Sequence, residues 1–239
     1  MGALHRLASA TALGAMLGCG CTATPLPEPP AAAIDFSRVT TPEVSPATNV
    51  ITLTGEPGAG PPGKALRVTN LDTDDPAVEV VIAADGSFQI SLPGSALDEL
   101  RFHTRAGRER DLPADYVVGV GPIADPERID CVLLTPLQQQ DFGFVSIGGA
   151  PAVHTITLRN ECAGSLSVTA AAPRRASTVF ALGAGAPVLP LDLTPGENLS
   201  WTLEFSPSSV GDAEEIFFVE VAAEGEPARY PLTLYGDGT

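Results

Sequence analysis

The sequence has few residues that carry positive charge. It contains one lysine, Lys64, and 13 Lys and Arg residues in all against 29 Asp and Glu, for a net charge of −16. Proteins that bind nucleic acid neutralise its phosphates with Lys and Arg, so this composition argues against nucleic acid as a partner. Acidity of this degree mainly keeps a protein soluble.

Signatures of catalysis are also missing. None of the motifs G-x-S-x-G, H-E-x-x-H, S-x-x-K or the Walker loop occurs in the sequence. His103 and His154 lie in separate predicted domains, and no Ser or Cys nucleophile is placed beside either of them. Both fit ordinary strand positions, and the alternation of residues predicts that His103 faces solvent. We therefore expect no enzyme activity, no catalytic residues, no cofactor and no metal site.

No apolar run reaches the roughly 18 residues that a membrane-spanning helix needs. The most apolar stretch, Leu7–Leu17, follows His5 and Arg6 and is followed by small residues. This arrangement is typical of a secretory signal peptide, which we assign to residues 1–18.

The segment Met16-Leu17-Gly18-Cys19 resembles the lipobox of bacterial lipoproteins, in which cleavage precedes an acylated cysteine. The family prefers Leu where Met16 stands. Cys21 is the alternative site, but Gly18 would then occupy the apolar position. The resemblance implies lipidation at Cys19 and a lipid anchor in the outer or the cytoplasmic membrane, with the protein facing the periplasm or the exterior of the cell envelope. An ordinary secretory signal is the other interpretation.

Proline and glycine are abundant, with 23 and 24 residues, whereas aromatic residues make up only 5% of the chain. Six prolines lie between residues 22 and 46 and favour extended geometry, so we expect residues 19–46 to form a semi-rigid linker. Beyond it, apolar and polar residues alternate in short runs between turn signals. This pattern predicts an all-β protein with two tandem sandwich domains.

The first predicted domain covers residues 47–121. Its runs GAGPPGKALRVTN and AADGSFQISLP resemble bacterial Ig-like or carboxypeptidase-regulatory-like modules. Asp85-Gly86 lies between two alternating runs and predicts a β-hairpin. The resemblance implies an immunoglobulin-like sandwich and says little about function.

The second predicted domain covers residues 127–239. Its order of motifs resembles the ASH (Hydin-like) family of Ig-like domains, which also closes many bacterial choice-of-anchor D surface proteins. The matching positions are Asp141-Phe142-Gly143, Val145, Gly148, Thr157-Leu158, Asn160, Phe180, Leu193, Pro195-Gly196-Glu197, Phe205, Pro207, Gly211, Leu234, Gly236 and Gly238. The resemblance implies a second immunoglobulin-like sandwich that contacts other proteins.

The ASH pattern places Cys131 and Cys162 at one end of the second sandwich. An exported protein meets an oxidising environment in which paired cysteines persist. We therefore expect a disulfide between these two residues, with Cys21 left in the linker; two separate thiols are the alternative.

Several functions remain open from the sequence. Asp72, Asp74 and Asp75 form an acidic loop, but their spacing matches no known calcium loop. The only basic cluster is Arg101, Arg105, Arg108 and Arg110, which we expect to pair with nearby acidic residues. Trp201 falls on the core side of its strand, whereas glycan-binding sandwiches expose aromatic residues. We expect a non-enzymatic protein-binding or structural module; a carbohydrate-binding module, a calcium-dependent adhesin and an accessory subunit of an envelope complex are alternatives.

Overall fold

The computed structural model describes residues 34–239. The predicted signal peptide and the residues Cys19 and Cys21 lie outside these described residues. The described residues belong to one compact unit. Among the described residues no helix is long and apolar enough to cross a membrane.

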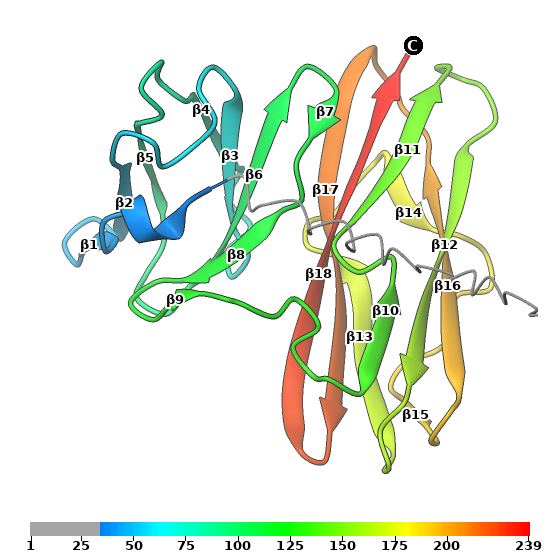
Figure 1. Ribbon diagram of the computed structural model, residues 1–239. Coiled ribbons are helices and arrows are strands. Elements are labelled where there is room, and N and C mark those ends of the chain that lie inside the picture. Colours follow the sequence, from blue (N-terminus) through cyan, green and yellow to red (C-terminus); the bar gives the residue numbers. More distant parts are fainter. Residues whose placement is uncertain (1–33) are drawn as a thin grey trace, which may run out of the picture. The chain divides into compact units, whose positions relative to one another are not determined.

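The described chain is built almost entirely of β-strands (Figure 1). Its first part contains a 3-10 helix, η1 (Phe36–Arg38), and the strands β1 (Glu43–Ser45), β2 (Val50–Gly55), β3 (Ala65–Asn70), β4 (Val78–Val81), β5 (Phe88–Pro93), β6 (Glu99–Ala106), β7 (Glu109–Arg110), β8 (Ala114–Val117) and β9 (Gly121–Pro122). These strands form two sheets, β1-β2-β5 and β4-β3-β6-β8-β9, with β7 paired to β6. We call this part the first sandwich.

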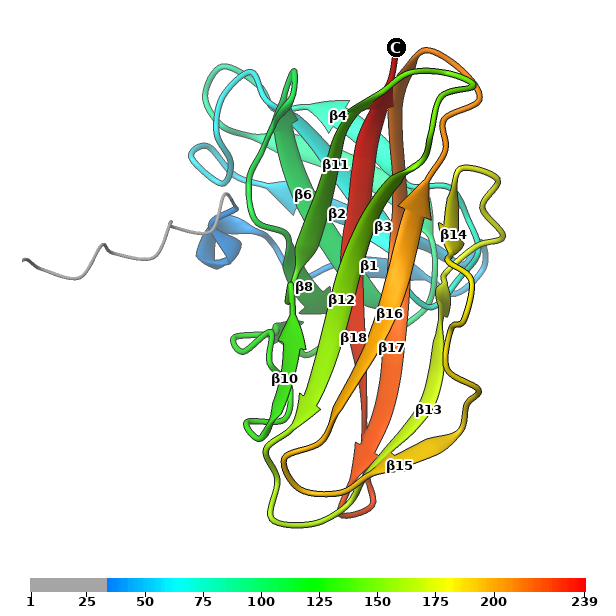
Figure 2. The same ribbon diagram turned by 90° about the vertical axis from the view of Figure 1, so that its right-hand side faces the viewer.

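The second sandwich follows after a connecting segment of residues 123–131. Its strands are β10 (Val132–Thr135), β11 (Gln139–Val145), β12 (Ala152–Asn160), β13 (Leu166–Pro173), β14 (Phe180–Leu182), β15 (Leu191–Leu193), β16 (Asn198–Phe205), β17 (Gly211–Ala223) and β18 (Glu226–Gly238). They form the sheets β10-β12-β16-β14 and β11-β18-β17-β13-β15 (Figure 2). The all-β fold class expected from the sequence is confirmed.

Each sandwich has its own apolar core, filled from both of its sheets. In the first sandwich, the alternating residues of β2 and β5 meet those of β3 and β6, as Leu53, Ile90, Leu66 and Phe102 show. In the second, Trp201 is 1% exposed and lies in one cluster with Phe142, Phe180 and Phe205, as the strand pattern predicted. The period-two pattern therefore identified the inward faces of both cores.

The start of the first sandwich differs from the expected linker. Ile34 is buried, Val44 packs on the core, and β1 pairs with β2. The ring of Phe36 lies 5.0 Å from that of Phe102, in an edge-to-face arrangement. The prediction that residues 34–46 belong to a linker is therefore wrong, because this segment carries apolar side chains that the core can bury. The part of the predicted linker from 19 to 33 lies outside the described residues.

The predicted hairpin at Asp85-Gly86 is also wrong, although its turn is present. Asp85 Oδ1 accepts a hydrogen bond from Ser87 N–H at 2.9 Å, and Gly86 has φ of +85°. The flanking strands β4 and β5 nevertheless belong to different sheets. A Cβ atom at Gly86 would lie 2.8 Å from the backbone nitrogen of Gly58. The glycine allows the crossing turn to pack against the backbone of residues 58–60.

Candidate functional site: a charged junction between the sandwiches

The outer face of β3, β6 and β8 carries polar and charged side chains, and the alternation pattern assigned His103, which alternates together with Arg101 and Arg105, to the solvent side. The structure instead buries them: Arg101 is 2% exposed, His103 3% and Asp115 6%. Arg101 contacts Thr233 of β18 and His103 approaches Glu214 of β17, whereas Asp115 pairs with Arg101 and Arg128. The prediction that His103 faces solvent is wrong, because the second sandwich covers this sheet face.

Arg101 lies at the centre of the covered face. Its Nε and Nη2 atoms donate to the two carboxylate oxygens of Asp115 at 2.7 and 2.8 Å. Its Nη1 donates to Thr233 Oγ1 on β18 at 3.1 Å. Burial opposes the charge of Asp115, but Arg101 and Arg128 outweigh it and hold the pKa of Asp115 below its ordinary value. A two-pronged pair of this kind fixes geometry as well as charge.

The β6–β7 hairpin forms the first group of contacts, which we call the hairpin patch. Arg108 Nη2 lies 2.8 Å from Asp237 Oδ2, and Arg105 forms an ion pair with Asp212. The Arg108 guanidinium lies 3.3 Å from the centre of the Phe144 ring. Arg110 Nη2 lies 3.6 Å from Asp212, with its guanidinium 4.2 Å from the Tyr235 ring. Charge and cation–π contacts therefore act together here.

Glu214 of β17 continues the hairpin patch towards β3. Its carboxylate lies 3.0 Å from Arg67 Nε and 3.6 Å from His103 Nδ1. Burial opposes its charge, but the contact with His103 and the charge of Arg67 hold the pKa of Glu214 below its ordinary value. This carboxylate is thus ionised inside the junction because cationic groups of the first sandwich surround it.

The second group of contacts, the linker patch, surrounds Arg128 of the connecting segment. Arg128 bonds Glu99 and, at 2.8 Å, Asp115 of the first sandwich. Arg229 of β18 reaches Asp72 at 2.8 Å and Glu99 at 3.3 Å. Arg128 has φ of +58°, a conformation that non-glycine residues seldom adopt. Its ion pairs hold the connecting segment against the first sandwich in this conformation.

Arg174 of the second sandwich reaches the acidic loop at Asp72 to Asp75. Its Nη1 atom donates to the carbonyl oxygens of Asn70 and Asp75 at 3.0 and 3.1 Å, and also to that of Thr73. Asp72 Oδ2 accepts a bond from Glu99 N–H at 2.6 Å. Protein donors therefore bond the Asp72 carboxylate and the carbonyl oxygens of Asn70, Thr73 and Asp75 in this loop. No group of three or more possible metal ligands occurs within residues 34–239.

The two patches have opposite polarity. In the hairpin patch the cations Arg67, Arg105, Arg108 and Arg110 belong to the first sandwich and the carboxylates Asp212, Glu214 and Asp237 to the second. In the linker patch the carboxylates Asp72 and Glu99 belong to the first sandwich and Arg229 to the second. Reversed docking would place like charges together, so this pattern selects one orientation.

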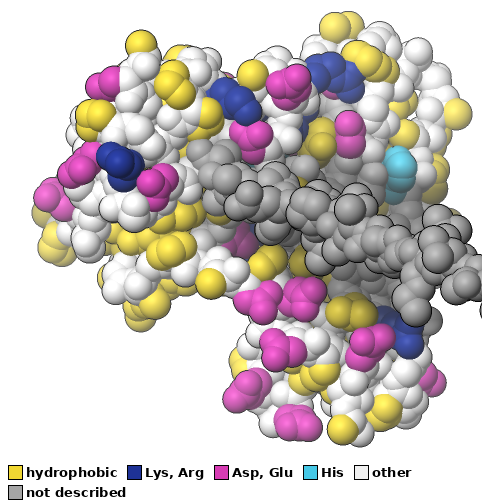
Figure 3. Space-filling view, in the orientation of Figure 1, with side chains coloured by type: hydrophobic (Ala, Val, Ile, Leu, Met, Phe, Trp, Pro, Cys, Tyr) yellow, Lys and Arg dark blue, Asp and Glu magenta, His cyan; other side chains and the backbone are white. Residues whose placement is uncertain are grey.

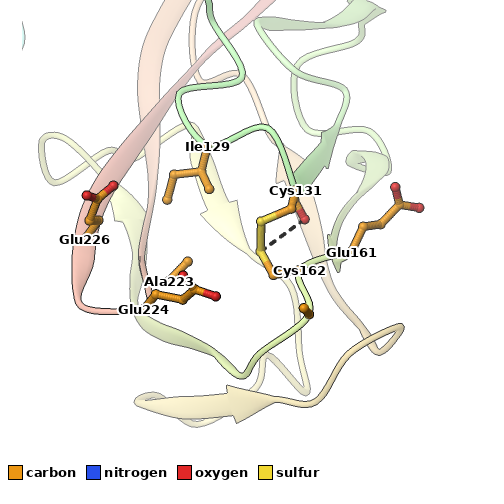
Figure 4. Close-up of a pocket in the computed structure, with 8 residues that line it drawn as sticks. Ile129, Cys131, Glu161, Cys162, Ala223, Glu224 and Glu226 are labelled. Carbon is orange, nitrogen blue, oxygen red and sulfur yellow. Dashed lines mark hydrogen bonds between the residues drawn. A yellow bond between two sulfur atoms is a disulfide. The ribbon is translucent and has the colours of Figure 1, made fainter.

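The disulfide lies outside the junction, at the end of the second sandwich (Figure 4). Cys131 and Cys162 are joined, as the sequence led us to expect, with Cα atoms 4.7 Å apart. Glu161, Glu224 and Glu226 line a shallow cavity of about 330 Å³ beside it. Figure 3 shows acidic side chains gathered over this end of the molecule. The disulfide closes this end by joining the connecting segment to the chain after β12.

The other residues considered in the sequence have structural contacts. Lys64 forms an ion pair with Asp111 at 2.7 Å. The His154 ring lies edge-on to that of Phe142, with centres 5.0 Å apart. The basic cluster on β6 and β7 pairs partly with local acids, as with Asp115 and Glu79, and partly with the second sandwich. Its concentration of arginines in an acidic chain was the sequence signal for the junction.

No family model and no curated protein matches the chain. Solved structures with a partial likeness include the PapD-like domain 7 of human CEP192, at 14% identity over 49% of this chain and 89% of that chain, with a TM-score of 0.36. The VesB protease of Vibrio cholerae shows 9% identity over 73% of this chain and 62% of its own, with a TM-score of 0.41. A protein from Porphyromonas gingivalis W83 shows 12% identity over 86% of this chain and 100% of its own, with a TM-score of 0.36. None of these likenesses assigns a function to the chain.

Proposed function

We propose that the chain is a lipid-anchored protein of the cell envelope that acts, without enzyme activity, as a protein-binding or structural module. One observation carries the proposal: the side chains that the sequence singled out for chemistry or binding lie in structural positions. The arginine cluster and His103 lie in the junction, and Trp201 lies in the core. The arginine cluster and His103 hold the two sandwiches in one arrangement, as a binding or spacing element requires.

Apolar side chains on loops provide surfaces for contact with a partner protein. Leu97 is 69% exposed, Val188 89% and Val210 77%. Leu97 belongs to the first sandwich, and Val188 and Val210 to loops of the second. Binding residues of β-sandwiches often lie on such loops, because the rigid sheets hold them in place.

The anchor is tested with Cys19→Ala in the full chain. The variant should leave the membrane fraction and lose incorporation of labelled palmitate, whereas Cys21→Ala should behave like the native protein. Label that persists in the first variant and disappears in the second would contradict the assignment to Cys19.

Partner binding is tested in cells by placing a photo-crosslinking amino acid at Leu97, Val188 or Val210, with Thr157 of the β12 sheet face as the control position. A discrete crosslinked protein should appear at one or more loop positions and be absent at the control. A calcium-dependent rise in melting temperature, or retention on a glycan array, would instead favour the adhesin or carbohydrate-binding alternatives.

A further inference from the structure

The hairpin patch contains an unfavourable feature of the second sandwich. Asp212 and Asp237 are direct cross-strand partners in the register of β17 and β18. Like charges directly opposite one another destabilise a sheet. Arg108 lies 2.8 Å from Asp237, and Arg105 and Arg110 approach Asp212. The second sandwich thus carries a pair of acids whose neutralising cations belong to the first sandwich.

A buried histidine lies in the same patch. His103 is 3% exposed, and its Nε2 atom has no hydrogen-bond partner within residues 34–239. On its other side, Nδ1 lies 3.6 Å from Glu214. Because Arg67 also approaches Glu214, this one carboxylate balances the cationic groups around it. Protonation of Glu214 would leave the Arg67 guanidinium without this counter-charge, beside the buried His103 ring.

We propose that the hairpin patch is an acid-sensitive latch, which holds the two sandwiches together while Asp212 and Glu214 are ionised and lets them separate, each still folded, when these carboxylates are protonated. The latch consists of charged contacts, and polar interfaces between domains permit relative motion more readily than large apolar ones. Loss of the two carboxylate charges leaves Arg67, Arg105 and Arg110 without their partners in the second sandwich. The separate apolar cores keep each sandwich folded.

The charged groups that face the latch come from several strands, and Glu215 of β17, with Arg174 after β13, lies beside Arg67 and Glu214. β4 contributes Glu79, which shares Arg105 with Asp212, and β6 contributes Arg105 and His103. Arg108 and Arg110 come from the β6–β7 hairpin, and Arg67 from β3. The hydrogen bond with Asp237 lowers the pKa of Asp212, while the same bond raises the pKa of Asp237. Asp212 therefore stays ionised to a lower pH than Asp237, and Arg105 and Arg110 bind its charge.

The direction of the pH effect follows from these shifts. A carboxylate whose pKa is lowered stabilises the docked state above its ordinary pKa, and this contribution is lost as the pH falls through the lowered value. Asp212 and Glu214 behave in this way towards docking, because Arg105 and Arg110 approach the first and Arg67 the second from across the junction. The bond between Asp212 and Asp237 lies within the second sandwich, so the raised pKa of Asp237 does not by itself oppose the effect. Protonation of Asp212 and Glu214 therefore opens the junction in acid.

The test is small-angle X-ray scattering of the full chain carrying Cys19→Ser, from pH 7.5 down to pH about 3, with circular dichroism of the same samples. The radius of gyration should rise in one step while the β-sheet spectrum is unchanged. Asp212→Asn should move the midpoint of that step by about one pH unit or more towards neutral. Asp192→Asn, on the exposed strand β15, is the matched control and should leave the midpoint where it was.

A radius of gyration that stays constant down to pH 3 would overturn the proposal. So would loss of the β-sheet spectrum together with the rise in radius, because the sandwiches would then unfold instead of separating.

Discussion

The cores of the sandwiches and the junction between them are held by different forces. The core around Trp201 and Phe180 is apolar and gains free energy from every side chain removed from water. The junction buries Arg101, Asp115 and Glu214, whose removal from water costs free energy that ion pairing only partly returns. The cores therefore supply the stability of each sandwich, whereas the junction holds two already stable sandwiches in a defined arrangement.

The largest effect is expected from Trp201→Ala. Trp201 is 1% exposed, and its truncation should lower the free energy of unfolding by about 3–5 kcal/mol, through lost burial and the cavity left behind. Urea unfolding followed by circular dichroism measures this loss. Thr202→Ala, at the neighbouring outward position, should change the value by less than about 0.5 kcal/mol. Similar losses in both variants would contradict the assignment of the core face.

The disulfide is expected to have the next largest effect. Cys131 and Cys162 have a sequence separation of 31. In the chain-entropy model, closing a loop of this length raises the free energy of unfolding by about 3–4 kcal/mol. The double variant Cys131→Ala/Cys162→Ala should show this loss in urea unfolding under oxidising conditions. Its stability should not change further on addition of reductant. Recovery of both cysteines as free thiols from purified native protein would refute the pairing.

A smaller effect is expected when the junction alone is broken with Asp115→Ala. Arg101 and Arg128 would then be buried without their counter-charge, which in a closed protein interior costs about 3–5 kcal/mol. Separation of the sandwiches lets water reach both arginines, so we expect a loss below about 3 kcal/mol and a raised radius of gyration at neutral pH. The difference from the native protein should shrink below about pH 4, because the lowered pKa of Asp115 makes its contribution present only above that range. A loss equal to that of Trp201→Ala, with no change in radius, would mean that the junction belongs to the core.

The smallest effect is expected from an ion pair at the surface. Arg159 lies 3.3 Å from Glu161, and both side chains are about half exposed, at 53% and 43%. Water and salt screen such pairs, so Arg159→Ala should change the melting temperature by about 1 °C or less. A larger shift, absent in Glu161→Gln, would show that Arg159 acts through contacts other than this pair.

Much of the fold follows from the sequence because strands have a strict period of two. The alternating residues of β16, from Leu199 to Phe205, identified their inward face without any tertiary information. Prolines and glycines located the turns, as at Gly196, which has φ of +84°. Turn signals do not specify which strands pair, however, and the turn at Asp85-Gly86 joins strands of different sheets.

By itself, the sequence determined the all-β class, the two cores and the partners in the disulfide, since these depend on local periodicity and on few cysteines. Only the tertiary structure decided that the polar faces of β3, β6 and β8 are buried. An outward polar residue has the same pattern whether it meets water or a second domain, so alternation cannot distinguish the two cases. Arg101 and His103 therefore looked like surface residues, and their burial depends on carboxylates such as Asp115 and Glu214 that lie 14 and 111 positions further along the chain.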